Sequence, residues 1–176
     1  MRGASRSPGR ESQPVTPAME DYLKAVFRMR DGTGAATIGR LSDEIGVSGP
    51  STTNMVKRLH EMGLVRHTPY RGVELTAAGE RLAVGVVRRQ WLLTLYLAEA
   101  LGFPWDEAHA EAERLEHCVS ATLEARMDVA LGHPTRDPNG DPILSRDGNV
   151  AELGASRLLD LEPGEGGVIA RVSRCS

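Results

Sequence analysis

The spacing of helix caps and glycines in the first half of the chain restricts its fold most strongly. Thr37 precedes a short segment with apolar residues at helical spacing, which Gly46 ends. Ser48 precedes a second such segment, with Pro50 in its first turn, which Gly63 ends. Ser and Thr favour the N-cap, proline the first turn, and glycine the position after the last turn. The chain therefore predicts two short consecutive helices joined by a tight turn.

A further helix precedes these two, and a hairpin follows them. Thr16 and Pro17 begin a helical pattern that Gly32 interrupts. After Gly63, two short apolar segments flank the turn at 69–72, which indicates a β-hairpin. Three helices and a hairpin in this order predict a winged helix-turn-helix.

The helix that follows Ser48 carries side chains suited to reading DNA. A helix in the major groove recognises bases through amide, hydroxyl and methyl groups near its N-terminus. Asn54 can pair with adenine, the Thr52 methyl group can contact thymine, and basic side chains can contact phosphates. The same pattern also fits a winged helix that contacts only protein. The predicted DNA-contacting residues are Ser48, Pro50, Ser51, Thr52, Asn54, Lys57, Arg58 and, in the hairpin, Arg71.

Apolar residues at helical spacing predict the buried helix faces. In the predicted DNA-reading helix these residues are Met55, Leu59 and Met62. Thr76 caps a longer helix that reaches about Leu101. Its apolar residues lie on more than one side, which predicts burial against a second copy of the chain in a homodimer.

A group of metal-ligating residue types follows the long helix. We expect one helix over residues 105–127, with a face for the core and a second face that holds carboxylates and imidazoles. Residues at i, i+4, i+7 and i+8 share one helix face. Here they are His109, Glu113, Glu116 and His117.

Two carboxylates and an imidazole on one face can bind a divalent cation. This donor set suits Mn(II) or Fe(II), and Asp21, near the start of the first helix, can complete the coordination shell. Cys118 lies about 100° around the helix from its neighbour and is interpreted as a packing residue. A solvated helix face gives the same pattern, so the alternative to a metal site is an ordinary exposed surface.

Composition limits the other possibilities. With 176 residues, of which 40% are hydrophobic, the chain can bury a core, and its net charge of -3 requires any DNA-binding surface to be local. Two cysteines, Cys118 and Cys175, do not make a disulfide framework. No apolar segment reaches the roughly 20 residues that cross a bilayer, and the polar N-terminal residues lack the apolar core expected of a signal peptide. We expect a soluble cytoplasmic protein without membrane association, and no nucleophile or phosphate loop points to an enzyme.

Several short motifs carry a resemblance to a known family. They are Met19-Glu20-Asp21-Tyr22-Leu23, the helix after Ser48, the wing Tyr70-Arg71-Gly72-Val73-Glu74-Leu75-Thr76, Val87-Arg88-Arg89, Trp105-Asp106-Glu107-x-His109, Glu113-x-x-Glu116-His117 and Asp137-Pro138-x-Gly140-Asp141-Pro142-Ile143. Through these motifs the chain resembles the diphtheria-toxin-repressor (DtxR) family of metal-dependent transcriptional repressors. The resemblance is greatest to the manganese-responsive (MntR) branch.

This resemblance implies a mainly α protein whose winged helix precedes a helical metal-binding and dimerisation domain. It implies a homodimeric repressor of metal-homeostasis genes that binds double-stranded operator DNA when metal is bound. In iron-type members the positions of Asp21 and Glu113 hold Met and Cys, so the carboxylates here favour Mn(II), with Fe(II) as the second candidate. The implied metal ligands are Asp21, Glu113, Glu116 and His117.

Three positions depart from the family pattern. Gln90 stands where the family usually has a metal-binding His, and Lys24 and Thr94 stand where some members have Glu. An ancillary metal site built from His109 and Gln90 is therefore expected to be weak or absent. The alternative function is a metal-independent winged-helix regulator with a degenerate metal site.

The expected organisation has four parts. Residues 1–16, rich in Ser, Gly, Pro and Arg, are expected to be a disordered tail. Residues 17–76 form the winged helix-turn-helix, and residues 77–143 form the metal-binding and dimerisation domain. Residues 144–176 are expected to be a linker and the truncated start of an SH3-like β domain.

Overall fold

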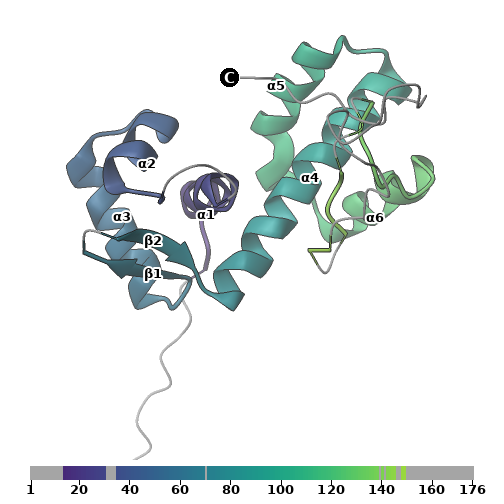
Figure 1. The fold of residues 1–176 in the computed structure, drawn as a ribbon. Coiled ribbons are helices and arrows are strands. Elements are labelled where there is room, and N and C mark those ends of the chain that lie inside the picture. Colours follow the sequence, from purple (N-terminus) through teal and green to yellow (C-terminus); the bar gives the residue numbers. More distant parts are fainter. Residues whose placement is uncertain are drawn as a thin grey trace, which may run out of the picture. The chain divides into compact units, whose positions relative to one another are not determined.

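The computed structural model describes residues 14–30, 35–69, 71–138, 140, 142–145 and 148–149. Most of the expected N-terminal tail and nearly all of the expected SH3-like segment lie outside these residues. The described chain is mainly helical with a two-stranded sheet, which confirms the predicted fold class (Figure 1). It divides into two compact units, Met1–Glu80 and Arg81–Ser176. Among the described residues, no helix is both long and apolar enough to cross a membrane.

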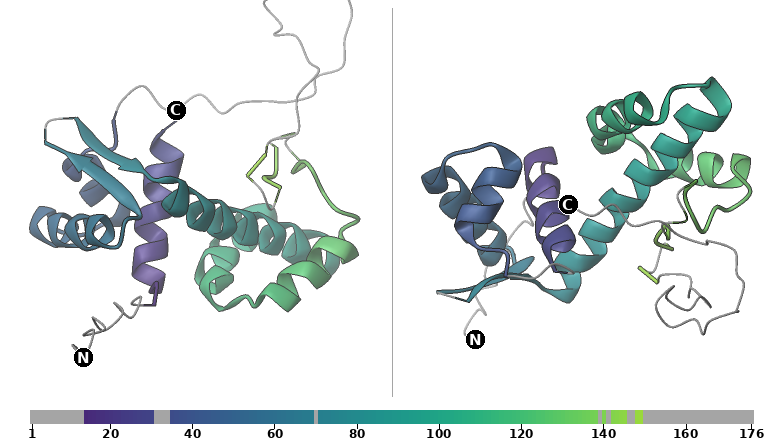
Figure 2. Two further views of the ribbon diagram at one scale, coloured as in Figure 1. Left: turned by 90° about the horizontal axis from the view of Figure 1, so that it is seen from below. Right: turned by 45° about the horizontal axis from the view of Figure 1, so that its top comes forward.

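The first unit is a three-helix winged helix. Its strands are antiparallel, with Val65 opposite Leu75, and Ala36 forms an isolated bridge to Val73. Two views show α1, α2 and α3 grouped beside the hairpin (Figures 1 and 2). Its elements are α1 (Pro17–Met29), α2 (Ile38–Ile45), α3 (Gly49–Glu61), β1 (Val65–Thr68) and β2 (Gly72–Leu75), followed by the first turn of α4 (Ala77–Leu101).

Side-chain caps begin the first three helices, as the sequence predicts. The hydroxyls of Thr16, Thr37 and Ser48 each accept the amide N–H three residues ahead, at 3.4, 3.3 and 3.4 Å. Gly46 ends α2 in the left-handed region, with φ of 73°, where a glycine has no side chain to clash. The caps therefore set the boundaries of these helices.

The buried face of α3 differs from the prediction at two of three sites. Val56 and Leu59 are buried, whereas Met55 and Met62 are only partly buried. Thr52 is fully buried and its Oγ1 accepts a hydrogen bond from the Tyr22 hydroxyl on α1, at 3.2 Å. This contact turns Thr52 and Val56 inward and moves Met55 to the edge of the core.

The second unit has a helical interruption that the sequence analysis did not foresee. In place of one helix over 105–127, it contains α5 (Trp105–Leu115), the 3-10 helix η1 (Glu116–Cys118) and α6 (Ala121–Ala130). Val119 is extended, with φ of -75° and ψ of 117°. Ser120 then accepts the N–H of Leu123 at 3.2 Å and caps α6. The chain therefore starts a new helix at the Ser120 cap, and α5 does not continue into α6.

The core of the second unit joins α4, α5 and α6. Leu92 on α4 is fully buried within this core. Leu115 and Leu123 are 39% and 47% exposed, because the break at η1 interrupts the single core face expected over residues 105–127. The buried core residues are Leu92, Leu93, Leu97, Ala108, Ala112 and Met127.

Candidate metal centre and nucleic-acid interface

Glu116 and His117, consecutive residues of η1, form the centre of the candidate metal site. The Glu116 side chain is fully buried and that of His117 is 13% exposed. The Nε2 atom of His117 lies 3.6 Å from Oε1 of Glu116. Two ligands that each lie about 2.1 Å from one ion are at most about 4.2 Å apart. The two side chains can therefore bind the same ion.

The backbone that carries Glu116 and His117 departs from an α-helix. Consecutive residues of a 3-10 helix are separated by about 120° around the axis, and its hydrogen bonds are poorer than those of an α-helix. The end of α5 tightens into η1, and the extended Val119 then turns the chain away. The predicted single α-helical face is therefore replaced by a short turn that carries Glu116 and His117.

The other two predicted residues of this face lie on α5. Glu113 is exposed near the end of that helix. His109 is partly buried, and its ring centroid lies 6.0 Å from that of Trp91 on α4. Trp105 lies 6.3 Å from the same indole. The imidazole of His109 is thus part of an aromatic cluster between α4 and α5.

Gln90 and Thr94, at the expected ancillary site, are buried on α4. Gln90 is 1% exposed and Thr94 is fully buried. The Thr94 hydroxyl donates a hydrogen bond to the main-chain oxygen of Gln90 at 2.8 Å. This bond within the helix occupies the Thr94 proton, and an amide oxygen is a weaker metal ligand than an imidazole.

The chemistry of the buried donors fits a divalent cation. A buried carboxylate is costly unless a cation offsets its charge, and Glu116 has no solvent exposure. A carboxylate oxygen with an imidazole nitrogen suits Mn(II) or Fe(II). Cys118, expected to pack inside, is instead exposed. Asp21, the remaining predicted ligand, is partly buried on α1 in the first unit.

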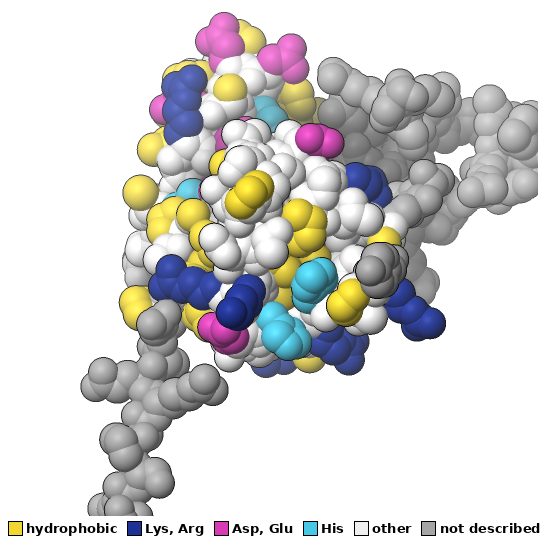
Figure 3. Space-filling model, turned by 90° about the vertical axis from the view of Figure 1, so that its left-hand side faces the viewer, with side chains coloured by type: hydrophobic (Ala, Val, Ile, Leu, Met, Phe, Trp, Pro, Cys, Tyr) yellow, Lys and Arg dark blue, Asp and Glu magenta, His cyan; other side chains and the backbone are white. Residues whose placement is uncertain are grey.

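The outer face of α3 presents the predicted DNA-contacting side chains, with one exception. Thr52 does not reach that face, because it is buried against α1. Its predicted contact with thymine is therefore wrong in this structure. Figure 3 shows this side of the molecule, where several Lys and Arg side chains lie in the lower half and others lie higher up. The exposed predicted residues are Ser48, Pro50, Ser51, Asn54, Lys57, Arg58 and Arg71.

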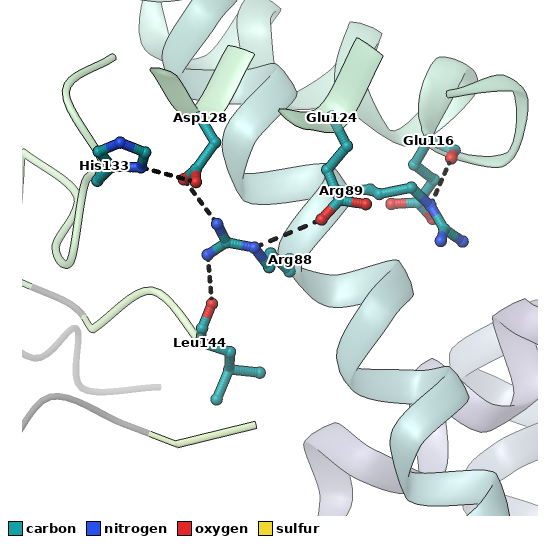
Figure 4. A network of polar contacts seen from close by, with 7 residues as sticks. All are labelled: Arg88, Arg89, Glu116, Glu124, Asp128, His133 and Leu144. Carbon is teal, nitrogen blue, oxygen red and sulfur yellow. Dashed lines mark hydrogen bonds and ion pairs between the residues drawn. The ribbon is translucent and has the colours of Figure 1, made fainter. Parts of the chain in front are cut away.

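A buried arginine, whose contacts the sequence analysis did not predict, connects three segments of the second unit (Figure 4). Arg88 on α4 contacts Asp128 Oδ1 at 2.6 Å and Glu124 Oε1 at 3.5 Å, both on α6. It also donates to the main-chain oxygen of Leu144 at 2.7 Å. The available signal was an arginine directly after the apolar run Val86-Val87 inside a helix.

The network also changes the acidity of Asp128. Burial raises the pKa of this carboxyl, but the hydrogen bond from His133 at 2.9 Å and the charge of Arg88 together lower it below its ordinary value of 3.8. Asp128 is therefore ionised near neutral pH and balances the buried guanidinium.

Comparison with known proteins agrees with this architecture. Residues 15–73 match the model of the iron dependent repressor N-terminal DNA binding domain, and residues 76–145 match that of the iron dependent repressor metal binding and dimerisation domain. The chain is 32% identical over 152 residues to the iron-dependent repressor IdeR of Mycobacterium leprae, covering 82% of this chain and 66% of that protein. It is 36% identical over 124 residues to IdeR of Mycobacterium tuberculosis, covering 70% and 54%.

A solved structure shows the same fold at higher identity. It is a manganese-dependent transcriptional repressor in complex with manganese, with 42% identity, a TM-score of 0.75, and coverage of 88% of this chain and 72% of that chain. Of the two curated relatives above, the chain spans 66% and 54% of the length, which is less than two thirds of each. The winged helix and the helical unit correspond in order to the two iron dependent repressor domains that match the chain. The chain belongs to the DtxR/MntR family of metal-dependent transcriptional repressors.

Proposed function

We propose that this chain is a Mn(II)-responsive repressor that binds operator DNA as a homodimer in the cytoplasm. The buried Glu116–His117 pair carries the proposal, because it places a carboxylate oxygen and an imidazole nitrogen 3.6 Å apart. The same chain contains α3, which exposes side chains suited to DNA contact. The identity of 42% to a repressor solved with manganese supports Mn(II), and the iron-dependent relatives make Fe(II) the second candidate.

The proposed ligand set extends beyond η1. Asp21 on α1 and Glu113 on α5 are proposed to add carboxylates to Glu116 and His117. When bound, the ion supplies positive charge that attracts these groups. Because Asp21 belongs to the DNA-binding half, ligation by Asp21 restricts the conformations of that half.

The proposed DNA contacts divide into two classes. Asn54 and Ser51, exposed near the N-terminal end of α3, are proposed to contact base edges. Lys57, Arg58 and Arg71 are proposed to contact phosphates, which fixes the register of the protein on the duplex. The proposed organisation assigns 17–76 to DNA binding and 77–143 to metal binding and dimerisation.

A DNA-binding assay with metal control tests this function. Fragments selected from random duplex DNA in the presence of Mn(II) are measured by fluorescence anisotropy with Mn(II), with Fe(II) under anaerobic conditions, and with chelator. Glu116→Gln and His117→Ala should abolish the metal-dependent part of the affinity, whereas Glu107→Gln, an exposed carboxylate on α5, should not. Equal affinity of the wild-type chain in Mn(II) and in chelator would contradict the proposal.

The second candidate function is a metal-independent regulator. Gln90 favours it, because a buried amide occupies the place of a family imidazole. In that case the selected DNA binds equally well in chelator, and Glu116→Gln affects neither DNA affinity nor its dependence on metal.

A further inference from the structure

Two consecutive arginines of α4 anchor different parts of the second unit (Figure 4). Arg88 contacts α6 and the main chain at Leu144. Arg89, about 100° further around the helix, donates from Nε to the main-chain oxygen of Glu116 at 3.1 Å. The second contact is made to the backbone of a proposed metal ligand.

The backbone of η1 depends on support from outside. This helix has 3 residues, its N-terminal position has no side-chain cap, and an extended Val119 follows it. Hydrogen bonds of 3-10 type have poorer geometry than those of an α-helix, so an outside contact adds support to η1. A bond from the long helix α4 to the Glu116 carbonyl therefore holds η1 at the point from which the carboxylate and imidazole project.

We propose that Arg89 is a positioning residue for the Glu116–His117 pair, acting through the Nε–H bond to the Glu116 carbonyl. This inference rests on the proposed function as a metal-dependent regulator. Arg89 does not bind the ion. It sets the orientation of the backbone that carries the ligands, and outer groups of this kind typically change metal affinity by about 10- to 100-fold.

A positioning role and a purely electrostatic role of Arg89 predict opposite changes in manganese affinity when Arg89 is replaced. A guanidinium near the site repels a dication, so if charge alone mattered, neutralising Arg89 would tighten manganese binding. If the Nε–H bond positions the ligands, its loss weakens binding. The sign of the change therefore separates the two roles.

Three substitutions distinguish the donor from the charge. Arg89→Met places a methyl group where Nε lies and so removes both the N–H donor and the positive charge. Arg89→Gln keeps an N–H donor at the same number of bonds from Cα but removes the charge, and Arg89→Lys keeps the charge but places a methylene where Nε lies. Arg81→Met, an exposed arginine on the same helix, is the matched control.

Manganese affinity is measured by titration calorimetry and by the electron paramagnetic resonance signal of free Mn(II). We expect Met and Lys at position 89 to weaken binding about 10-fold or more, Gln to restore most of the loss, and Arg81→Met to bind as wild type. The absorption spectrum of bound Co(II) should change in the Met variant, since it reports coordination geometry. In the metal-free protein, amide hydrogen exchange over 116–119 should accelerate in the Met and Lys variants and less in the Gln variant.

The outcomes separate this inference from the proposed function. Manganese binding by Arg89→Met that equals or exceeds wild type would overturn the positioning role alone. Wild-type affinity in the Lys variant with equal losses in Met and Gln would also overturn it, because charge would then be the cause. A wild-type chain that binds no manganese would overturn the proposed function and this inference together. If the Met variant does not fold, the Gln and Lys variants decide.

Discussion

A buried arginine destabilises a protein unless its charge is balanced, and two carboxylates beside Arg88 balance it. Its side chain is 7% exposed and contacts two carboxylates of α6 and one main-chain oxygen. Hydrogen bonds between charged groups contribute about 1.5–3 kcal/mol each. Removing one partner leaves part of the desolvation cost of Arg88 without compensation. The network therefore makes the packing of α6 on α4 specific.

We expect Asp128→Asn to lower the free energy of unfolding by about 2 kcal/mol at neutral pH. Because the pKa of Asp128 is lowered in the folded state, its contribution is complete above the ordinary value of 3.8 and is lost as the pH falls through the lowered pKa. Urea unfolding at several pH values measures the difference from wild type, with the exposed Asp43→Asn as control. A difference that stays constant from neutral pH to below the lowered pKa would contradict this assignment.

Gln90 sets the expected number of metal ions. Its buried amide replaces an imidazole of the family pattern, and the neighbouring Thr94 hydroxyl is bonded within the helix. We expect the wild-type chain to have one tight manganese site, and Gln90→His to strengthen binding of a second ion because imidazole is the better ligand. Calorimetric stoichiometry tests this, with Thr94→Val as a control that adds no ligand. Two tight, fully occupied sites in the wild type would refute it.

At the scale of elements, local signals predicted the first unit better than the second. Each of the first three helices begins at a Thr or Ser that caps it, and these caps are read directly from the sequence. The break at η1 was missed because Glu113, Glu116 and His117 fit a continuous helical period. Ser120 was the overlooked signal. Local sequence patterns could not predict the contacts of Arg88. Its partners Glu124, Asp128 and Leu144 lie 36, 40 and 56 positions further along the chain.

The Ser120 cap should stabilise α6 and hold the interruption before it. We expect Ser120→Ala to lower the free energy of unfolding by about 1 kcal/mol, because the Leu123 amide loses its acceptor. Thr122→Ala, at an exposed position in the same first turn, should cost less or nothing, since alanine favours helix. Thermal and urea unfolding of both variants measure the effect. Equal losses in the two variants would show that Ser120 does not act as a cap.

At the scale of the whole molecule, the matches to a DNA-binding and to a metal-binding family domain lie in different halves of the chain. The DNA-binding match ends at residue 73 and the metal-binding match begins at residue 76. The sequence predicts both halves, because each has its own local motifs. Coupling between them is a free-energy difference between conformations, which no motif encodes. It has to be measured as a change in one affinity caused by the other ligand.

The proposed switch requires the coupling to be reciprocal. If Mn(II) tightens the affinity for selected DNA by some factor, that DNA must tighten the affinity for Mn(II) by the same factor. Typical couplings of about 1–3 kcal/mol correspond to about 5- to 150-fold. Anisotropy titrations of DNA with and without Mn(II), and calorimetric titrations of Mn(II) with and without DNA, measure the two factors independently. Asp21→Asn should reduce both together if this residue links the halves. A variant that loses manganese affinity but retains the full coupling would exclude Asp21 from the switch.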